Sequence, residues 1–214
     1  MKMKKKKLFI AIILLASFVL WTVLISLVDV KPIGPNATSV GFATLNRFFH
    51  ELTGVNLQLY IITDWLGLIP IAAAFGFAIL GVIQLIKRKS LWKVDFNILA
   101  LGTFYIVVII AYLFFEIFII NYRPTLINGY LEASYPSSTT MLVMSVMPTM
   151  AMQLNVRIKN IIARRCAIIA IMAFIAFMVI ARLLSGVHWI TDIIGGALLS
   201  AGLVILYDAI GKVK

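Results

Sequence analysis

The sequence predicts an all-α protein in which six transmembrane helices form one bundle, with both termini in the cytoplasm. Of its 214 residues, 63% are hydrophobic and 13% are charged. Soluble domains are about half apolar and about a quarter charged, so an ordinary soluble globule is excluded. In addition, long uncharged runs alternate with short basic clusters, as in membrane proteins. The single cysteine, Cys166, cannot form an intrachain disulfide.

Six segments are apolar and long enough to cross a bilayer as helices, for which about 20 residues are needed. In chain order they are residues 8–28, 65–86, 96–115, 135–156, 166–181 and 189–207. Pro148 interrupts the fourth segment, which membrane helices tolerate. The first segment is expected to remain as a span, because its apolar run exceeds the usual length of about 7–15 residues in a cleaved signal peptide.

The basic residues predict the orientation of these spans. Fifteen of the 19 lysine and arginine residues fall before the first span, in the second-to-third and fourth-to-fifth connections, or after the last span. The positive-inside rule assigns these positions to the cytoplasm. A nucleic-acid-binding protein would instead carry its cations on one polar face, so the net charge of +11 predicts a membrane partner and no nucleic acid.

The longest polar stretch, residues 29–64, is expected to form an extracytoplasmic loop. Within it, residues 43–52 predict a short amphipathic helix, because apolar residues recur at helical spacing. These apolar residues are Leu45, Phe48, Phe49 and Leu52. The helix would either lie on the outer membrane interface or cap the bundle. Residues 1–214 as a whole are predicted to form a single membrane domain.

Polar residues that could bind an anion gather at the outer ends of the spans. They are Arg123 after the third span, Ser137, Ser138 and Thr139 at the start of the fourth, Arg182 near the end of the fifth, and His188 and Asp192 at the sixth. Two guanidinium groups can hold one phosphate, and the N-terminus of a helix also favours an anion. Separately, the arginines could contact lipid headgroups and the serines could cap a helix. Their coincidence at one membrane face predicts a site for a phosphorylated ligand.

His188 and Asp192 are four residues apart and would share one face of a helix. A carboxylate at that spacing can hold the imidazole in one tautomer, which suits a histidine nucleophile or base. Asp192 could instead pair with Arg182. We expect no metal site, because the sequence holds two histidines and one cysteine, and His50 is far from His188 in the chain.

In this order and spacing, the polar residues resemble the three signatures of the type 2 phosphatidic acid phosphatase and vanadium haloperoxidase superfamily. The matching residues are Arg123-Pro124 for the first signature, Pro136-Ser137 for the second, and Arg182, His188 and Asp192 for the third. The resemblance spans roughly residues 90–210, which would form the phosphatase-like core.

The resemblance implies a phosphatase that uses no metal or other cofactor. His188 would attack the phosphorus and form a phospho-histidine, and Asp192 would orient His188. Arg123, Arg182 and Ser137 would bind the phosphoryl oxygens and stabilise the transition state. Membrane members of the family act on lipid phosphates and isoprenoid diphosphates outside the cytoplasm. The expected substrate is therefore a phosphorylated lipid, and the expected place is a bacterial cell membrane, with the site facing outward.

Three positions depart from the signatures. Glu116 stands where the first has lysine, Thr139 where the second has the general-acid histidine, and Ala181 where a serine precedes the third-signature arginine. General acid catalysis is worth about 10²–10⁴ in rate. Either the substrate has a good leaving group, such as a diphosphate, or turnover is lost and the chain binds or carries phosphorylated lipids. Glu116 could pair with Arg123, which favours the second alternative. A plain membrane scaffold is a third alternative.

Overall fold

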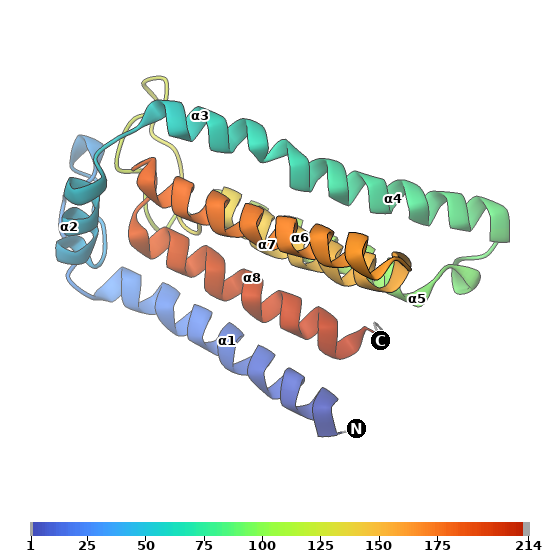
Figure 1. Cartoon of the computed structure of the whole chain (residues 1–214). Coiled ribbons are helices and arrows are strands. Elements are labelled where there is room, and N and C mark those ends of the chain that lie inside the picture. The colour runs from blue at the N-terminus through green and yellow to red at the C-terminus, as the bar shows by residue number, and fades with distance from the viewer. Residues whose placement is uncertain (1, 212–214) are drawn as a thin grey trace.

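Residues 2–211 are described in the computed structural model, where six long helices form a bundle and a short helix crosses one end of it (Figure 1). The long helices are α1 (Lys2–Leu27), α4 (Leu68–Arg88), α5 (Phe96–Ile117), α6 (Ser138–Arg157), α7 (Ile161–Leu184) and α8 (Ile190–Ile210). The shorter ones are η1 (Pro35–Ala37), α2 (Ala43–Thr53), α3 (Leu57–Leu66) and η2 (Leu91–Lys93). The predicted all-α bundle is confirmed.

Five helical segments of residues 2–211 are long and apolar enough to cross a membrane: α1, α3 joined to α4, α5, α7 and α8. The predicted fourth span, α6, is more polar and is not among these five. Other helices surround it, so its polar side chains do not face lipid. Its polar side chains bond inside the bundle: Ser145 with Ser200, Thr149 with Tyr105, and Gln153 with Tyr207. The second span begins at Leu57, earlier than predicted, so the end of the expected outer loop is helical.

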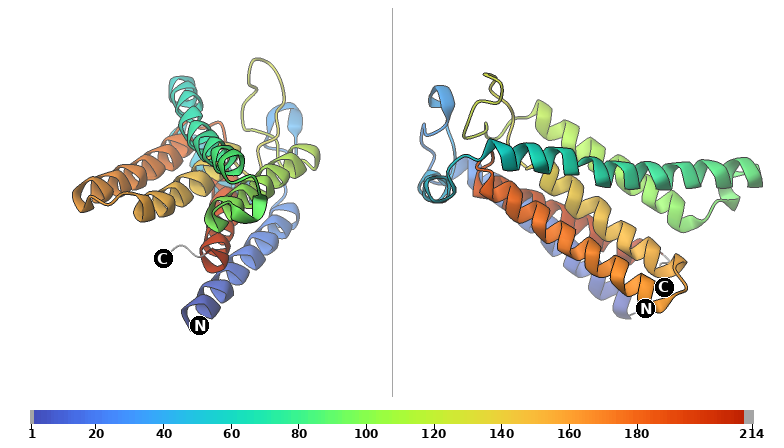
Figure 2. Two further views of the ribbon diagram at one scale, coloured as in Figure 1. Left: turned by 90° about the vertical axis from the view of Figure 1, so that its right-hand side faces the viewer. Right: turned by 45° about the horizontal axis from the view of Figure 1, so that its top comes forward.

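Both termini lie at one end of the bundle, together with the α4–α5 and α6–α7 connections (Figures 1 and 2). The opposite end carries α2, the long α5–α6 segment and the short α7–α8 turn. This alternation agrees with the predicted succession of spans. Three of the predicted basic clusters therefore lie together at the end with the termini, whereas Lys212 and Lys214 lie outside the described residues.

Helix α2, which was predicted over residues 43–52, caps the start of α8. Its Asn46 side chain is fully buried and donates hydrogen bonds to Gly41 O (2.8 Å) and Thr191 Oγ1 (3.0 Å). In return, the Thr191 backbone N–H donates to Asn46 Oδ1 (3.3 Å). The outer side of α2 keeps Phe48 exposed. The helix thus caps the bundle and leaves an apolar surface at the outer end.

Two glycines permit close approaches that shape the outer end of the bundle. Gly186 has a φ of +66°, and a Cβ there would lie 1.8 Å from Gly54 O, so the α7–α8 turn packs directly on the segment before α3. A Cβ on Gly195 would lie 2.3 Å from the Tyr135 ring. The absence of a side chain at Gly195 therefore lets the end of the α5–α6 segment rest on the first turns of α8.

We expect Asn46→Ala to lower the free energy of unfolding by about 1–3 kcal/mol, because the buried Thr191 N–H loses its acceptor. Thermal unfolding in detergent measures the effect. The exposed Asn155, near the end of α6, provides the control, and Asn155→Ala should change stability by less than about 0.5 kcal/mol. Equal losses in both variants would contradict the role of Asn46 in holding α8.

Candidate functional site

His188 lies in the buried turn that joins α7 to α8. The turn, and not α8 itself, carries the imidazole, so the prediction that His188 and Asp192 share one face of a helix is wrong. Its Nδ1 is 3.0 Å from Ser134 Oγ. Its Nε2 is buried and has no hydrogen-bond partner among the described residues. The ring is thus held at one nitrogen, while the other is available to a ligand.

Asp192 occupies the first turn of α8 and is completely buried. Its Oδ2 accepts hydrogen bonds from Ser134 Oγ (2.5 Å) and from the Trp189 backbone N–H (3.0 Å), and Oδ1 accepts from Asn121 Nδ2 (3.4 Å). His188 Nδ1 is 3.9 Å from Oδ2, too far for a direct hydrogen bond. The predicted partners are therefore brought together, with the Ser134 hydroxyl between them.

Arg123 and Arg182 come from different connections and meet at one aromatic ring. Arg123 lies in the α5–α6 segment, Arg182 lies in the last turn of α7, and both are buried. Their Cζ atoms lie 5.7 Å and 4.8 Å from the centre of the Tyr60 ring. Such cation–π contacts position a guanidinium group without occupying its N–H donors.

Several N–H donors of the two guanidinium groups remain available. Arg182 donates from one terminal nitrogen to Thr63 Oγ1 (3.2 Å), but its Nε is buried without a hydrogen-bond partner. In Arg123, Nε and one terminal nitrogen are likewise buried without one. Buried donors are normally satisfied, so these groups point to an anionic ligand.

Within the described residues, Glu132 is the carboxylate that pairs with Arg123. Its Oε2 lies 3.1 Å from Arg123 Nε, although outside hydrogen-bonding geometry, and its side chain is 40% exposed. Glu116, which the sequence suggested as the partner, bonds with Tyr112 on the same helix. The counter-ion of Arg123 thus comes from the α5–α6 segment, and its side chain is partly exposed to solvent.

The N-terminus of α6 lies beside Asp192. Ser137 is the N-cap residue, and its hydroxyl accepts the Thr140 N–H at 3.5 Å. The Ser137 backbone N–H donates to Asp192 O at 3.0 Å, which joins α6 to α8. Ser138 and Thr139 form the first turn and line a groove of about 420 Å³. The groove continues between α4 and α5 along Leu68, Ile71, Val108, Ile109 and Leu142.

Burial lowers the pKa of His188 well below 6.5, and the positive charges of Arg123 and Arg182 lower it further. A hydrogen bond with the Ser134 backbone acts in the opposite direction but is the smallest of these effects. The imidazole is therefore neutral near pH 7, which is the state that a nucleophile requires.

Tyr60, Thr63 and Ser134 belong to the site but were not predicted. Tyr60 and Thr63 are three residues apart on α3, so they share one helix face. However, residues that only pack against neighbouring helices show the same spacing equally often. Ser134 lies immediately before residues 135–156, which the sequence assigned to the fourth span. Its position two residues before the second signature was the available signal, but a lone serine carries no evident chemistry.

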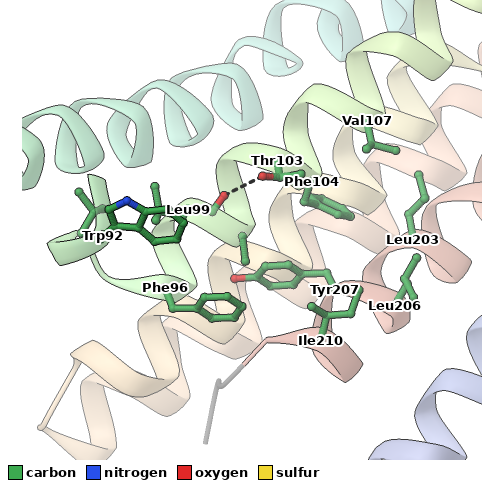
Figure 3. Close-up of a pocket in the computed structure, with 12 residues that line it drawn as sticks. Trp92, Phe96, Leu99, Thr103, Phe104, Val107, Leu203, Leu206, Tyr207 and Ile210 are labelled. Carbon is green, nitrogen blue, oxygen red and sulfur yellow. Dashed lines mark hydrogen bonds between the residues drawn. The ribbon is translucent and has the colours of Figure 1, made fainter. Parts of the chain in front are cut away.

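Other features of the described residues do not form a second site of this kind. The His50 ring lies 5.5 Å from that of Trp189, the neighbour of His188, although it is distant in sequence. Within residues 2–211, no three His, Cys, Asp or Glu side chains are arranged to hold a metal ion. A groove of about 470 Å³ lies near η2 and the end of α8, and apolar residues such as Phe104 and Leu203 line it (Figure 3).

Comparisons with known proteins agree with the resemblance seen in the sequence. The profile of the PAP2 superfamily matches residues 104–211. A crystal structure of "the first transmembrane PAP2 type phosphatidylglycerolphosphate phosphatase from Bacillus subtilis" is 19% identical and superposes with a TM-score of 0.54, over 92% of this chain and 94% of that chain. At this identity, the likeness shows a common fold. A search of curated proteins found no match.

We expect the His188 imidazole to titrate with a midpoint below 6.5, the ordinary value. Nitrogen NMR of the two ring-labelled histidines measures it, and His50→Gln assigns the signals. Arg182→Gln should raise the midpoint because it removes a nearby positive charge, whereas Arg47→Gln, on the exposed side of α2, should not.

The same shift predicts that the contribution of His188 to the free energy of unfolding falls as the pH drops below 6.5. In that range the unfolded chain takes up a proton at His188 that the folded protein does not, so acid favours unfolding. A His188 midpoint at or above 6.5 would contradict both expectations.

Proposed function

Because the chain belongs to the PAP2 superfamily, we propose that it is a membrane lipid phosphatase that works through a phospho-histidine at His188. Its substrate is a lipid phosphate or a polyprenyl diphosphate, hydrolysed at the extracytoplasmic face. One observation carries the proposal: Nε2 of His188 has no hydrogen-bond partner and shares a buried site with N–H groups of two arginines that also lack one. A nucleophile surrounded by fixed positive charge suits phosphoryl transfer.

In the first step, the His188 Nε2 lone pair forms a bond to phosphorus. The bond between phosphorus and the leaving oxygen breaks, and its electron pair stays on that oxygen, which takes a proton from solvent to form the lipid alcohol or, from a diphosphate, departs as part of the lipid monophosphate. In the second step, a water oxygen attacks phosphorus, the water gives a proton to solvent, and the phosphorus–nitrogen bond breaks. Inorganic phosphate departs and neutral His188 is restored.

Arg123 and Arg182 bind the phosphoryl oxygens and stabilise the charge that develops on them. The N-terminus of α6 adds positive potential through the backbone N–H groups of Ser138 and Thr139, for which Ser137 provides the cap. Because Tyr60 fixes both guanidinium groups, their charge needs little reorganisation during the reaction. Glu132 leaves Arg123 when the phosphate binds.

The groove beside Thr139 receives the leaving group and the start of its hydrocarbon chain. It begins at Asp64, Ser138 and Thr139 and becomes apolar between α4 and α5. A lipid whose phosphate headgroup binds the arginines would thus extend its hydrocarbon tail toward the bilayer. Thr139 cannot act as a general acid, so a diphosphate, whose leaving group is weakly basic, is the better substrate.

The proposed orientation places this site outside. The basic clusters lie at the end of the bundle with the termini, and the site lies at the opposite end. The positive-inside rule assigns the former to the cytoplasm. As an integral protein of a bacterial cell membrane, the chain would meet its substrate in the outer half of the bilayer.

A second function is binding or carriage of a phosphorylated lipid without turnover. Two observations favour it: Thr139 replaces the general acid, and Glu132 lowers the positive potential at Arg123. The experiments below separate this alternative from hydrolysis.

We expect the purified protein to release phosphate from phosphatidate and, faster, from a polyprenyl diphosphate, in detergent with a chelator present. His188→Ala should abolish release because no phospho-histidine can form. Arg182→Ala should reduce kcat by about 10²–10³ because a transition-state donor is lost. Arg47→Ala removes an arginine from the same end of the protein outside the site and should leave activity unchanged.

Release that persists in His188→Ala would contradict the phospho-histidine. Lack of release, together with lipid binding that Arg182→Ala weakens, would favour the binding protein. If neither activity nor binding depends on these residues, the chain is a membrane scaffold and the proposed function is wrong.

Restoring an acid at the leaving-group side gives a separate test. We expect Thr139→His to increase turnover of a monophosphate lipid by more than that of a diphosphate, because the alkoxide leaving group needs the proton more. Steady-state kinetics with both substrates measures the ratio. An equal effect on both, or no effect on either, would argue against the leaving-group explanation.

A further inference from the structure

We propose that Ser134 is a positioning residue that transmits the effect of Asp192 to His188. Its hydroxyl holds the imidazole in the tautomer with hydrogen on Nδ1, so that Nε2 presents a lone pair. The tautomer is a property of the folded protein, whereas its consequence for catalysis rests on the proposed function.

The directions of the hydrogen bonds follow from the number of donors. Asp192 Oδ2 accepts the Trp189 backbone N–H, which can only donate, at 3.0 Å. An ionised carboxylate only accepts, and the same oxygen lies 2.5 Å from Ser134 Oγ, so the single hydroxyl hydrogen of Ser134 points at the carboxylate. Ser134 Oγ then has only lone pairs to offer His188 Nδ1 at 3.0 Å. Nδ1 must therefore carry a hydrogen.

The position of Ser134 is fixed from several sides. Its backbone N–H donates to Asn121 O at 2.9 Å, and the side chain is buried. The neighbouring Tyr135 packs on Gly195, and its hydroxyl is 2.7 Å from Thr22 Oγ1 of α1. The backbone around Ser134 is thus held by α1, α8 and the α5–α6 segment, while its hydroxyl bonds with Asp192 and His188.

The arrangement also suits the charge that develops on the ring. When Nε2 bonds to phosphorus, the imidazole becomes positive while Nδ1 keeps its hydrogen. Ser134 then accepts a stronger hydrogen bond from Nδ1 and donates a stronger one to Asp192, since linked hydrogen bonds polarise one another. At 3.9 Å, the carboxylate has no direct hydrogen bond to the ring. Removal of Ser134 should therefore make His188 much less sensitive to Asp192.

Nitrogen NMR of ring-labelled histidine tests the tautomer without any substrate. In the wild-type protein above the His188 midpoint, hydrogen should reside on Nδ1. In Ser134→Ala, hydrogen should distribute between Nδ1 and Nε2, and Ser134→Thr, which keeps a hydroxyl, should restore the wild-type pattern. Ser145→Ala is the matched control, because it removes another buried hydroxyl that bonds Ser200 instead.

Kinetics tests the transmission. Ser134→Ala should lower kcat by at least about tenfold with little change in KM. In that background, Asp192→Asn should lower kcat by a smaller factor than it does in the wild-type protein, because the two residues act as one unit. Fully multiplicative effects would contradict the proposal.

The outcomes separate the positioning role from the proposed function. A wild-type ring with hydrogen on Nε2 would overturn the role of Ser134 even if Ser134→Ala fails to fold. A tautomer unchanged in Ser134→Ala would do the same while hydrolysis remained intact. Conversely, a protein without phosphatase activity whose tautomer depends on Ser134 would support the positioning role and refute the proposed enzyme.

Discussion

Two buried guanidinium groups repel one another beside a neutral imidazole. The other residues at the outer end of the bundle hold these side chains in place. Burial of charge is unfavourable unless partners compensate for it. Here Tyr60 contacts both Arg123 and Arg182 through its ring, yet several N–H donors keep no partner. An anion would satisfy those donors and relieve the repulsion between the cations. Burial, together with the same positive charge, keeps His188 neutral, so the site that binds phosphate also holds a nucleophile in its reactive state.

Contacts within the bundle hold the residues of the site in fixed positions. Asn46 of α2 fixes the start of α8, and the turn that bears His188 packs directly on the segment before α3. The close contact between Tyr135 and Gly195 brings Ser134 between Asp192 and the imidazole. Polar groups that would be unfavourable in lipid are thus enclosed by helices whose outer surfaces are apolar.

The sequence was sufficient for the helices and for most of the site, but for different reasons. Long uncharged runs can satisfy their backbone in a membrane only as helices, so the spans were predictable, apart from the extension at Leu57. The arginines, His188 and Asp192 were identified because charged groups at membrane depth are rare. Their partners Tyr60 and Ser134 were missed, because an aromatic residue and a serine are ordinary in such places and only the tertiary contacts distinguish them.

A structure of the protein determined with orthovanadate, a mimic of the transferring phosphoryl group, tests the shared anion site most directly. The account predicts vanadium bonded to Nε2 of His188, with its oxygens accepting hydrogen bonds from Arg123 and Arg182. The Ser134 hydroxyl should remain on Nδ1. Vanadate bound away from both arginines, or an imidazole turned so that Nδ1 faces it, would contradict the central claim.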